Sequence, residues 1–260
     1  MSESCLFSAE PPLAILTFNR PEARNALTWE MYQGLLDACD TVEGRADIRV
    51  LIVRGAGGKA FAAGTDISQF TGFRSAEDGV EYERRLDAAI DRLERVTKAT
   101  IAQVQGVATG GGCAIALTCD LRVCTPDARF GVPIAKTLGN CLSIANSARL
   151  MDLLGPARFK DLMITARLMD VHEASSVGLV TRVAETHRID EVTRELATTI
   201  AGHAPLAIAV TKEMVRRIQE HRRPAAETGH DLIGRCYGSQ DFKEGVEAFL
   251  AKRTPRWSGR

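Results

Sequence analysis

The chain of 260 residues carries 33 basic and 33 acidic side chains, so its formal net charge at neutral pH is zero, and 45% of its residues are hydrophobic. That length suits one large core, or a core with an appended lobe. A chain without net charge has no overall electrostatic attraction to nucleic acid or to an anionic membrane, and no apolar run is long enough to cross a bilayer. We therefore expect neither kind of partner.

Hydrophobic patterning predicts strands and helices in alternation through the first half of the chain. Apolar and β-branched runs predict strands at residues 13–18, 48–54, 100–104 and 121–124. Helices are predicted from Thr28, a residue type that caps helices, to about residue 43, and over residues 75–96. From residue 143 the pattern is helical, with segments at 143–154, 156–165, 171–177, 189–203, 205–221 and 241–253.

A run of three glycines separates the third predicted strand from a short apolar helix. Residues 103–120 read QVQGVATGGGCAIALTCD, which predicts a strand, a tight turn at Gly110, Gly111 and Gly112, and a helix. The first amides of such a helix have no intrahelical acceptor and lie at the positive end of the helix dipole, so an oxyanion can bind there. The alternative is that the glycines only allow close packing of neighbouring segments.

A second motif, FAAGTDI at residues 61–67, follows the strand at 48–54 and a GAGGK loop. Together with QGVATGGGCA, it resembles the crotonase superfamily, the enoyl-CoA hydratase/isomerase family. The resemblance extends to the segments NRP, NAL, FGVP and FLAKR, at residues 19–21, 25–27, 130–133 and 249–253. It implies an α/β fold in which a spiral of β-β-α turns forms a core over residues 1–200. A C-terminal helical lobe over residues 201–260 would then build homotrimers, commonly paired as hexamers.

The resemblance also implies an acyl-CoA site. In this family the residue after the glycine of the first motif and the middle glycine of the second donate backbone N–H groups to the thioester oxygen, which makes Thr65 and Gly111 the expected donors. CoA would arrive as part of the substrate, so no separate cofactor is expected. The implied CoA contacts are Arg24, Ala26, Ala63, Asp66 and Ile67, although an aspartate placed like Asp66 more commonly caps the next helix. In the tail, Lys243, Phe249 and Lys252 are candidate contacts to the CoA of a neighbouring subunit, or ordinary helix-face residues.

Hydratases of this family use two glutamates, one in the pattern GGGCE and one in the pattern FGxPE. Ala114 and Ile134 occupy these positions here, so the usual two-glutamate mechanism is not expected. Replacement groups are sought in the loop after Ile134. Lys136 would be a base if burial lowered its pKa, and Asn140 would donate a hydrogen bond to a polar acyl group. Cys141 is either a nucleophile or an inert buried thiol, and Lys136 is alternatively a surface lysine.

Three functions are weighed on this basis. The first is hydration or double-bond isomerisation of an enoyl-CoA with non-standard acid and base groups. The second is decarboxylation of a malonyl-type acyl-CoA, because loss of CO₂ forms the enolate without a base. The third is a non-catalytic acyl-CoA-binding protein.

The cysteines and histidines add two expectations. The seven cysteines show no CxxC pair and no zinc spacing, and residues 1–12 lack the pattern of a secretory signal, so we expect reduced thiols in a cytoplasmic protein. The five histidines lack the HxxxH spacing, so no metal site is assigned.

Overall fold

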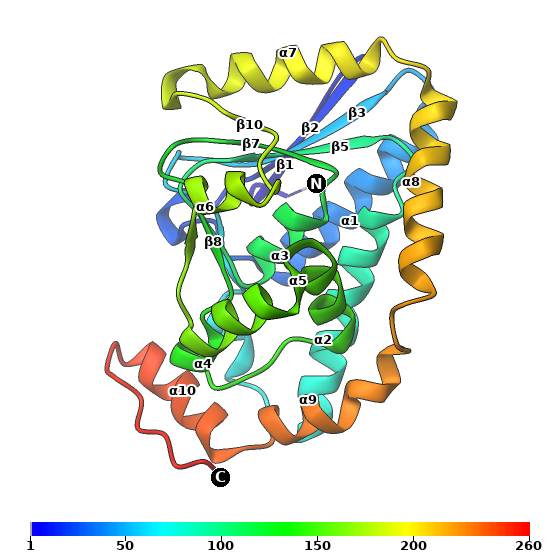
Figure 1. The fold of residues 1–260 in the computed structure, drawn as a ribbon. Coiled ribbons are helices and arrows are strands. Elements are labelled where there is room, and N and C mark those ends of the chain that lie inside the picture. The colour runs from blue at the N-terminus through cyan, green and yellow to red at the C-terminus, as the bar shows by residue number, and fades with distance from the viewer. Residues whose placement is uncertain (1) are drawn as a thin grey trace.

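The computed structural model describes residues 2–260 and contains two β-sheets surrounded by helices (Figure 1). The larger sheet has six strands in the order β1-β2-β3-β5-β7-β10, which span Cys5–Glu10, Leu13–Phe18, Val50–Gly55, Ala99–Val104, Leu121–Cys124 and Arg182–Val183. β1 and β2 form an antiparallel hairpin, and the other pairs of this sheet are parallel. The smaller sheet has the order β4-β6-β8-β9, which span Ala60–Ala63, Val107–Thr109, Arg129–Gly131 and Met169–Asp170.

After the β1–β2 hairpin and α1, three successive turns of the chain each add one strand to each sheet and then a helix. β3 and β4 precede α2, β5 and β6 precede α3, and β7 and β8 precede α4 and α5. The helices α1 to α10 span Trp29–Gly44, Ala76–Glu94, Gly111–Thr118, Ile134–Thr137, Ile144–Thr165, Val171–Ser176, Ile189–Ala201, Pro205–Glu220, His230–Tyr237 and Gln240–Leu250. The predicted spiral of β-β-α turns is confirmed.

Two hydrophobic cores lie on opposite faces of the larger sheet. On one face, β2 and β3 contribute Leu16, Leu51 and Val53 to a core that α1, α2 and α3 also fill. On the other face, Ile15 and Ile52 pack with residues of α7, which runs along the sheet at the top of Figure 1. Strands buried on both faces form because their apolar residues are continuous rather than alternating.

Most predicted elements match the structure to within a few residues. Thr28 caps α1 by accepting a hydrogen bond from the Met31 amide, and Ser75 and Asp78 form a capping box at the start of α2. Gly155, at φ 72°, interrupts α5 between the two helices that were predicted there. β1, the four short strands of the smaller sheet, β10, α9 and the short α4 in the expected loop after Ile134 were not predicted. The predicted division at residue 200 falls close to the turn between α7 and α8, and it stays a prediction.

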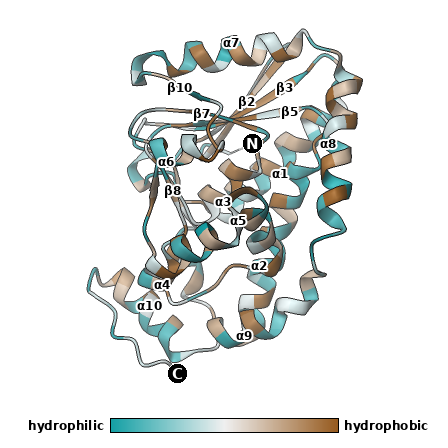
Figure 2. Cartoon of the chain, in the orientation of Figure 1, coloured by the Kyte–Doolittle hydropathy of each residue, from teal (hydrophilic) through white to brown (hydrophobic). Residues whose placement is uncertain are grey.

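The last three helices extend around the side and base of the molecule (Figure 1). α8 carries apolar residues on its outer side as well as toward the protein, as the mixed colours in Figure 2 show. Within residues 2–260, none of the helices is both long and apolar enough to cross a membrane. α9 packs on α2, and α10 packs on the short helix at Ile67–Phe70, so the chain's end returns to the segment that follows Thr65.

Candidate active site

Two loops that follow neighbouring parallel strands of the smaller sheet meet at one edge. Because β4 and β6 are parallel, the residues after each strand leave the sheet at the same end. Thr65 follows β4, and Gly111 begins α3 just after β6. A Cβ atom built on Gly110 would lie only 3.3 Å from the Cα atom of Gly64. Both of these glycines have positive φ, at 52° and 95°, which side chains disfavour.

The backbone amides of Thr65 and Gly111 are left free by this arrangement. On either side of Thr65, the Leu27 amide donates to the Gly64 carbonyl at 2.8 Å, and the Asp66 amide donates to the Leu27 carbonyl at 2.9 Å. No oxygen within residues 2–260 accepts a hydrogen bond from the amide of Thr65 or Gly111. Two free amides in adjacent loops, one of them at a helix N-terminus, can stabilise an oxyanion.

Three hydroxyl groups gather beside these amides. The Thr65 hydroxyl lies 2.6 Å from the Tyr82 hydroxyl and 3.1 Å from the Tyr32 hydroxyl. The Tyr32 oxygen would lie 2.3 Å from a Cβ atom built on Gly111, so this phenol borders the second amide. Burial raises the pKa of both tyrosines above the ordinary value, which keeps the phenols protonated at neutral pH and able to donate.

Both positions where the family's hydratases carry glutamate are apolar and buried. Ala114 lies on α3 and is 5% exposed, and Ile134 begins α4 and is 8% exposed. Neither side chain can transfer a proton, so any proton transfer here would use groups from elsewhere in the fold.

Glu83 on α2 is a buried carboxyl that the sequence analysis missed. It is 2% exposed, and it accepts hydrogen bonds from the Tyr237 hydroxyl at 2.5 Å and from the Ser143 amide at 3.1 Å. Burial raises the pKa of Glu83 to about 8, and the negative charge of Asp87 adds to the rise. A carboxyl with such a pKa can give or take a proton near neutral pH.

Asn140 joins this group rather than standing beside the free amides. Its Nδ2 donates to the Tyr237 hydroxyl oxygen at 2.9 Å, and its Oδ1 is buried with no hydrogen-bond partner among residues 2–260. The Tyr237 ring lies 6.0 Å from the Tyr82 ring, so the Glu83 group is one aromatic ring away from the Thr65 hydroxyl. The expected donation from Asn140 to an acyl group stays a prediction.

For two other candidates of this segment, Lys136 and Cys141, the structure favours the non-catalytic interpretation. Lys136 is exposed on α4, which favours the alternative that it is a surface lysine, and a role as a base stays a prediction. Cys141 is half-buried, and the neighbouring Cys236 thiol together with burial raises the pKa of Cys141. A protonated thiol is a poor nucleophile, so the inert interpretation of Cys141 is favoured. Ser143 caps α5 by accepting from the Asn146 amide at 3.1 Å.

The five residues expected to contact CoA lie along one connected rim. The Ala63 amide donates to the Arg24 carbonyl at 3.0 Å, and the Arg20 guanidinium donates to the Ala26 carbonyl at 2.7 Å and to the Asp66 carboxylate at 2.9 Å. The full rim consists of Arg24, Ala26, Ala63, Asp66 and Ile67, of which Arg24 is exposed. Asp66 also caps the short helix at Ile67–Phe70 by accepting a hydrogen bond from the Ser68 amide at 3.1 Å. This cap gives the Asp66 carboxylate a structural role.

The tail residues occupy α10 and the turn after it. Lys243, Phe249 and Lys252 are all exposed. Lys243 also lines a cavity of about 540 Å³ whose aromatic walls include Phe70 and Tyr237. The expected contacts between these residues and the CoA of a neighbouring subunit stay predictions.

The groups that sequence reasoning missed share one signal. Tyr32, Tyr82 and Glu83 all lie on helices that follow the motif loops, and each falls at helical spacing from buried apolar residues. Glu83, for example, precedes Leu86 by three residues and Ile90 by seven, which places a carboxyl on the apolar face of α2. A charged residue on a buried face is a candidate for function or for a specific partner.

Comparisons with known proteins find relatives that match almost the whole chain in sequence and in fold. A sequence model of the enoyl-CoA hydratase/isomerase family matches residues 9–260. The short-chain-enoyl-CoA hydratase of Clostridium acetobutylicum is 33% identical over 249 residues, which cover 95% of each chain. The structure of an enoyl-CoA hydratase/carnitine racemase from Magnetospirillum magneticum is 34% identical, with a TM-score of 0.81 over 100% of this chain and 97% of that one. A methylmalonyl-CoA decarboxylase in complex with 2-nitronate-propionyl-CoA is 28% identical, with a TM-score of 0.90 and 100% coverage of both chains.

Proposed function

Because the chain belongs to the enoyl-CoA hydratase/isomerase family, we propose that it binds an acyl-CoA thioester and stabilises the corresponding enolate at the amides of Thr65 and Gly111. The observation that carries this proposal is the pair of free amides in adjacent loops. As the thioester becomes an enolate, negative charge develops on its oxygen, and a donor fixed in advance stabilises that charge without reorganising. Each such donor contributes roughly 10²–10³ in rate.

Hydration or double-bond isomerisation is the first reaction we propose. Hydration adds hydroxide to the β-carbon and a proton to the α-carbon, and isomerisation removes a proton from one carbon and returns one to another. The protonated phenols of Tyr32 and Tyr82 lie nearest the donor amides. Glu83, with its pKa of about 8, is the carboxyl suited to exchange protons through this group.

Decarboxylation of a malonyl-type acyl-CoA is the second reaction, and a specific observation favours it. The C–C bond to the carboxylate breaks, CO₂ leaves, and the electron pair forms the enolate, which then takes a proton at the α-carbon. This sequence needs no base, so it tolerates alanine at position 114 and isoleucine at position 134. The similar fold of a methylmalonyl-CoA decarboxylase also supports this reaction.

The CoA contacts, the cofactor requirement and the oligomeric state that we propose are those expected from the family. The rim at Arg24, Ala26, Ala63, Asp66 and Ile67 would contact CoA, which arrives with the substrate, and no further cofactor is proposed. A homotrimer or a hexamer in the cytoplasm is the proposed form of the protein.

A panel of thioesters tests the reaction. Crotonyl-CoA, a β,γ-enoyl-CoA and methylmalonyl-CoA would be incubated with the protein and their products identified by mass. A gain of roughly 18 mass units, the mass of one water, would identify hydration, and a loss of roughly 44 units, the mass of CO₂, would identify decarboxylation. Isomerisation leaves the mass unchanged, so it would be detected by the change in ultraviolet absorbance as the double bond becomes conjugated with the thioester. Binding of CoA esters without any product would instead support the non-catalytic alternative.

A further inference from the structure

Two half-buried cysteines meet at the last turn of α9. Cys141 lies in the segment between α4 and α5, and Cys236 lies on α9. The Cys141 sulfur lies 3.9 Å from the carbonyl oxygen of Leu232, one helical turn before Cys236. A helical side chain leans toward the N-terminus of its helix, so the Cys236 sulfur projects over this same turn. A hydrogen bond joins the two thiols.

The residues beside the two cysteines hold their segments together. Asn140, just before Cys141, donates a hydrogen bond to the hydroxyl oxygen of Tyr237, just after Cys236, at 2.9 Å. Tyr237 in turn donates to the buried carboxylate of Glu83 at 2.5 Å. Both cysteines also pack against the core that α1, α2 and α3 fill. Consecutive residues of the same two segments are therefore in contact, which keeps the thiols adjacent without any change of fold.

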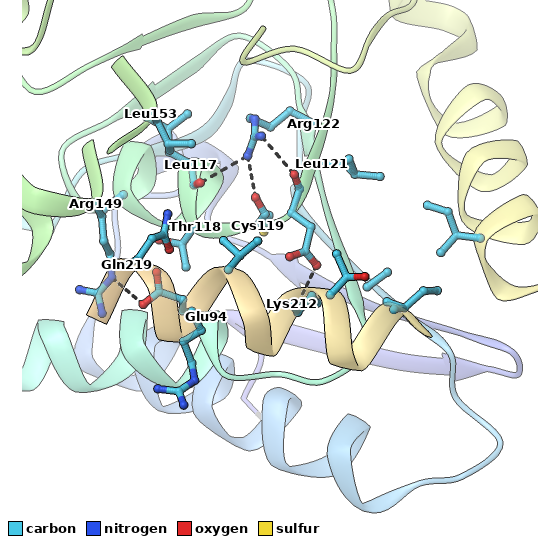
Figure 3. Close-up of a pocket in the computed structure, with 18 of the residues that line it drawn as sticks. Glu94, Leu117, Thr118, Cys119, Leu121, Arg122, Arg149, Leu153, Lys212 and Gln219 are labelled. Atoms are coloured by element: carbon cyan, nitrogen blue, oxygen red, sulfur yellow. Dashed lines mark hydrogen bonds and ion pairs between the residues drawn. The ribbon is translucent and has the colours of Figure 1, made fainter. Parts of the chain in front are cut away.

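The other five cysteines are chemically different from this pair. They are fully buried, and they are Cys5, Cys39, Cys113, Cys119 and Cys124. Burial raises the pKa of each of these thiols to about 12. The effect holds even for Cys119, whose carbonyl accepts a hydrogen bond from the Arg122 guanidinium at 2.6 Å (Figure 3), because burial outweighs the nearby positive charge. All five thiols therefore stay protonated at neutral pH and react poorly with oxidants.

Cys236 is the reactive member of the pair. The hydrogen bond that Cys141 donates lowers the pKa of Cys236 to about 7, and the positive charge of Arg235 adds to the effect. A large fraction of Cys236 is therefore a thiolate at neutral pH, which is the form that attacks oxidants. Cys141 keeps its proton, since the pKa of its thiol is raised by the same hydrogen bond and by burial.

We propose that Cys141 and Cys236 form a reversible disulfide when a peroxide oxidises the protein. The Cys236 thiolate attacks one peroxide oxygen, the O–O bond breaks and hydroxide leaves, so Cys236 becomes a sulfenic acid. The Cys141 sulfur then attacks the Cys236 sulfur, the S–S bond forms, and the hydroxyl group leaves with the Cys141 proton as water. Two electrons pass from the thiols to the peroxide, and two molecules of a small thiol return them on reduction.

The position of the pair gives the disulfide a regulatory character. Disulfides in cytosolic proteins are usually transient and redox-sensing. The bond would join the segment that carries Asn140 to the helix that carries Tyr237, so the redox switch adjoins the Glu83 group. The inference does not depend on which reaction the donor amides serve.

Peroxide treatment of the reduced, full-length protein tests the disulfide. After a short exposure to hydrogen peroxide, the remaining thiols would be alkylated and the peptides identified by mass. The number of free thiols should fall by two from the seven of the reduced chain, with one cross-link between the peptides of Cys141 and Cys236. The cross-link should lie within a single chain, and dithiothreitol should restore both thiols.

Three variants separate the roles of the two cysteines. Cys141→Ser keeps a hydroxyl that can donate to Cys236 but removes the second thiol, so a sulfenic acid should accumulate at Cys236 and react with dimedone. Cys236→Ser removes the thiolate, so Cys141 should stay free. Cys39→Ala removes a buried thiol from α1, and as the matched control it should leave the cross-link unchanged.

The wild-type protein alone decides the proposal, whether or not every variant folds. Persistence of both free thiols after peroxide treatment would overturn it. Cross-links to the buried cysteines, or a loss of thiols that dithiothreitol does not reverse, would overturn it as well.

Discussion

At the scale of single residues, adding one methyl group at Gly111 should lower activity strongly. A Cβ atom there would lie 2.3 Å from the Tyr32 hydroxyl and 3.5 Å from a Leu27 methyl, so Tyr32 would have to move away from Thr65. We expect Gly111→Ala to lower kcat by roughly 10²–10³ in the panel reaction, because the donor amide and its hydroxyl neighbours shift together. Gly44→Ala, at the end of α1 where an added methyl meets nothing within 4 Å, is the matched control and should keep full activity.

The buried carboxyl of Glu83 predicts how stability depends on pH. Its pKa rises from the ordinary 4.5 to about 8 on folding, so the native state holds a proton that the unfolded chain releases. The stability linked to this proton is fully present below pH 4.5 and is lost as pH rises through about 8. Between pH 5 and pH 9 the wild type should therefore lose on the order of a few kcal/mol of unfolding free energy that Glu83→Gln, which cannot ionise, retains.

Urea unfolding at both pH values measures this difference. Glu77→Gln, an exposed position on the same helix, should follow the wild-type pH dependence. Asp87, whose pKa is also raised by burial, is kept in every variant. A parallel pH response in the wild type and Glu83→Gln would show that the carboxyl does not hold a proton at neutral pH.

At the scale of elements, the sequence predicts long buried segments well and short ones poorly. β2 and β7 match their predicted bounds because most of their residues are apolar and buried inside the larger sheet. β6 and β8 have three residues each, too few for any periodic pattern, and they form because their neighbours in the smaller sheet pair with them. The groups around Thr65 could not be predicted from the sequence for the same reason. Tyr82 and Glu83 lie near the Thr65 loop only because α2 packs against the core.

The short helix at Ile67–Phe70 allows a test of whether Asp66 is structural. Its carboxylate caps the helix and pairs with Arg20, and both side chains are about three-quarters buried, at 22% and 25% exposed. Asp66→Asn retains a capping oxygen and should keep turnover within a few-fold, while Asp66→Ala should lower the unfolding free energy by about 1–2 kcal/mol. Thermal and urea unfolding would be compared with kcat. A large loss of kcat in Asp66→Asn, with stability unchanged, would assign the carboxylate to the chemistry instead.

At the scale of the whole molecule, α8 presents two faces to different surroundings. Residues such as Ile208, Lys212 and Val215 line a cavity between α8 and α3 (Figure 3), while Leu206 and Met214 are 74% and 60% exposed on the outer side. A helix that is apolar on both sides is stable in water only if each side is covered. We propose that the outer side of α8 is covered by another subunit of the homotrimer.

Met214→Lys tests this assembly, since a charge buried at a subunit contact would be costly. The expected result is a fall in mass by light scattering from that of a trimer or hexamer toward the 28.2 kDa of one chain. Leu6→Lys, on the exposed side of β1, puts the same charge at another exposed apolar residue and should leave the mass unchanged. If Met214→Lys also leaves it unchanged, α8 is not the contact.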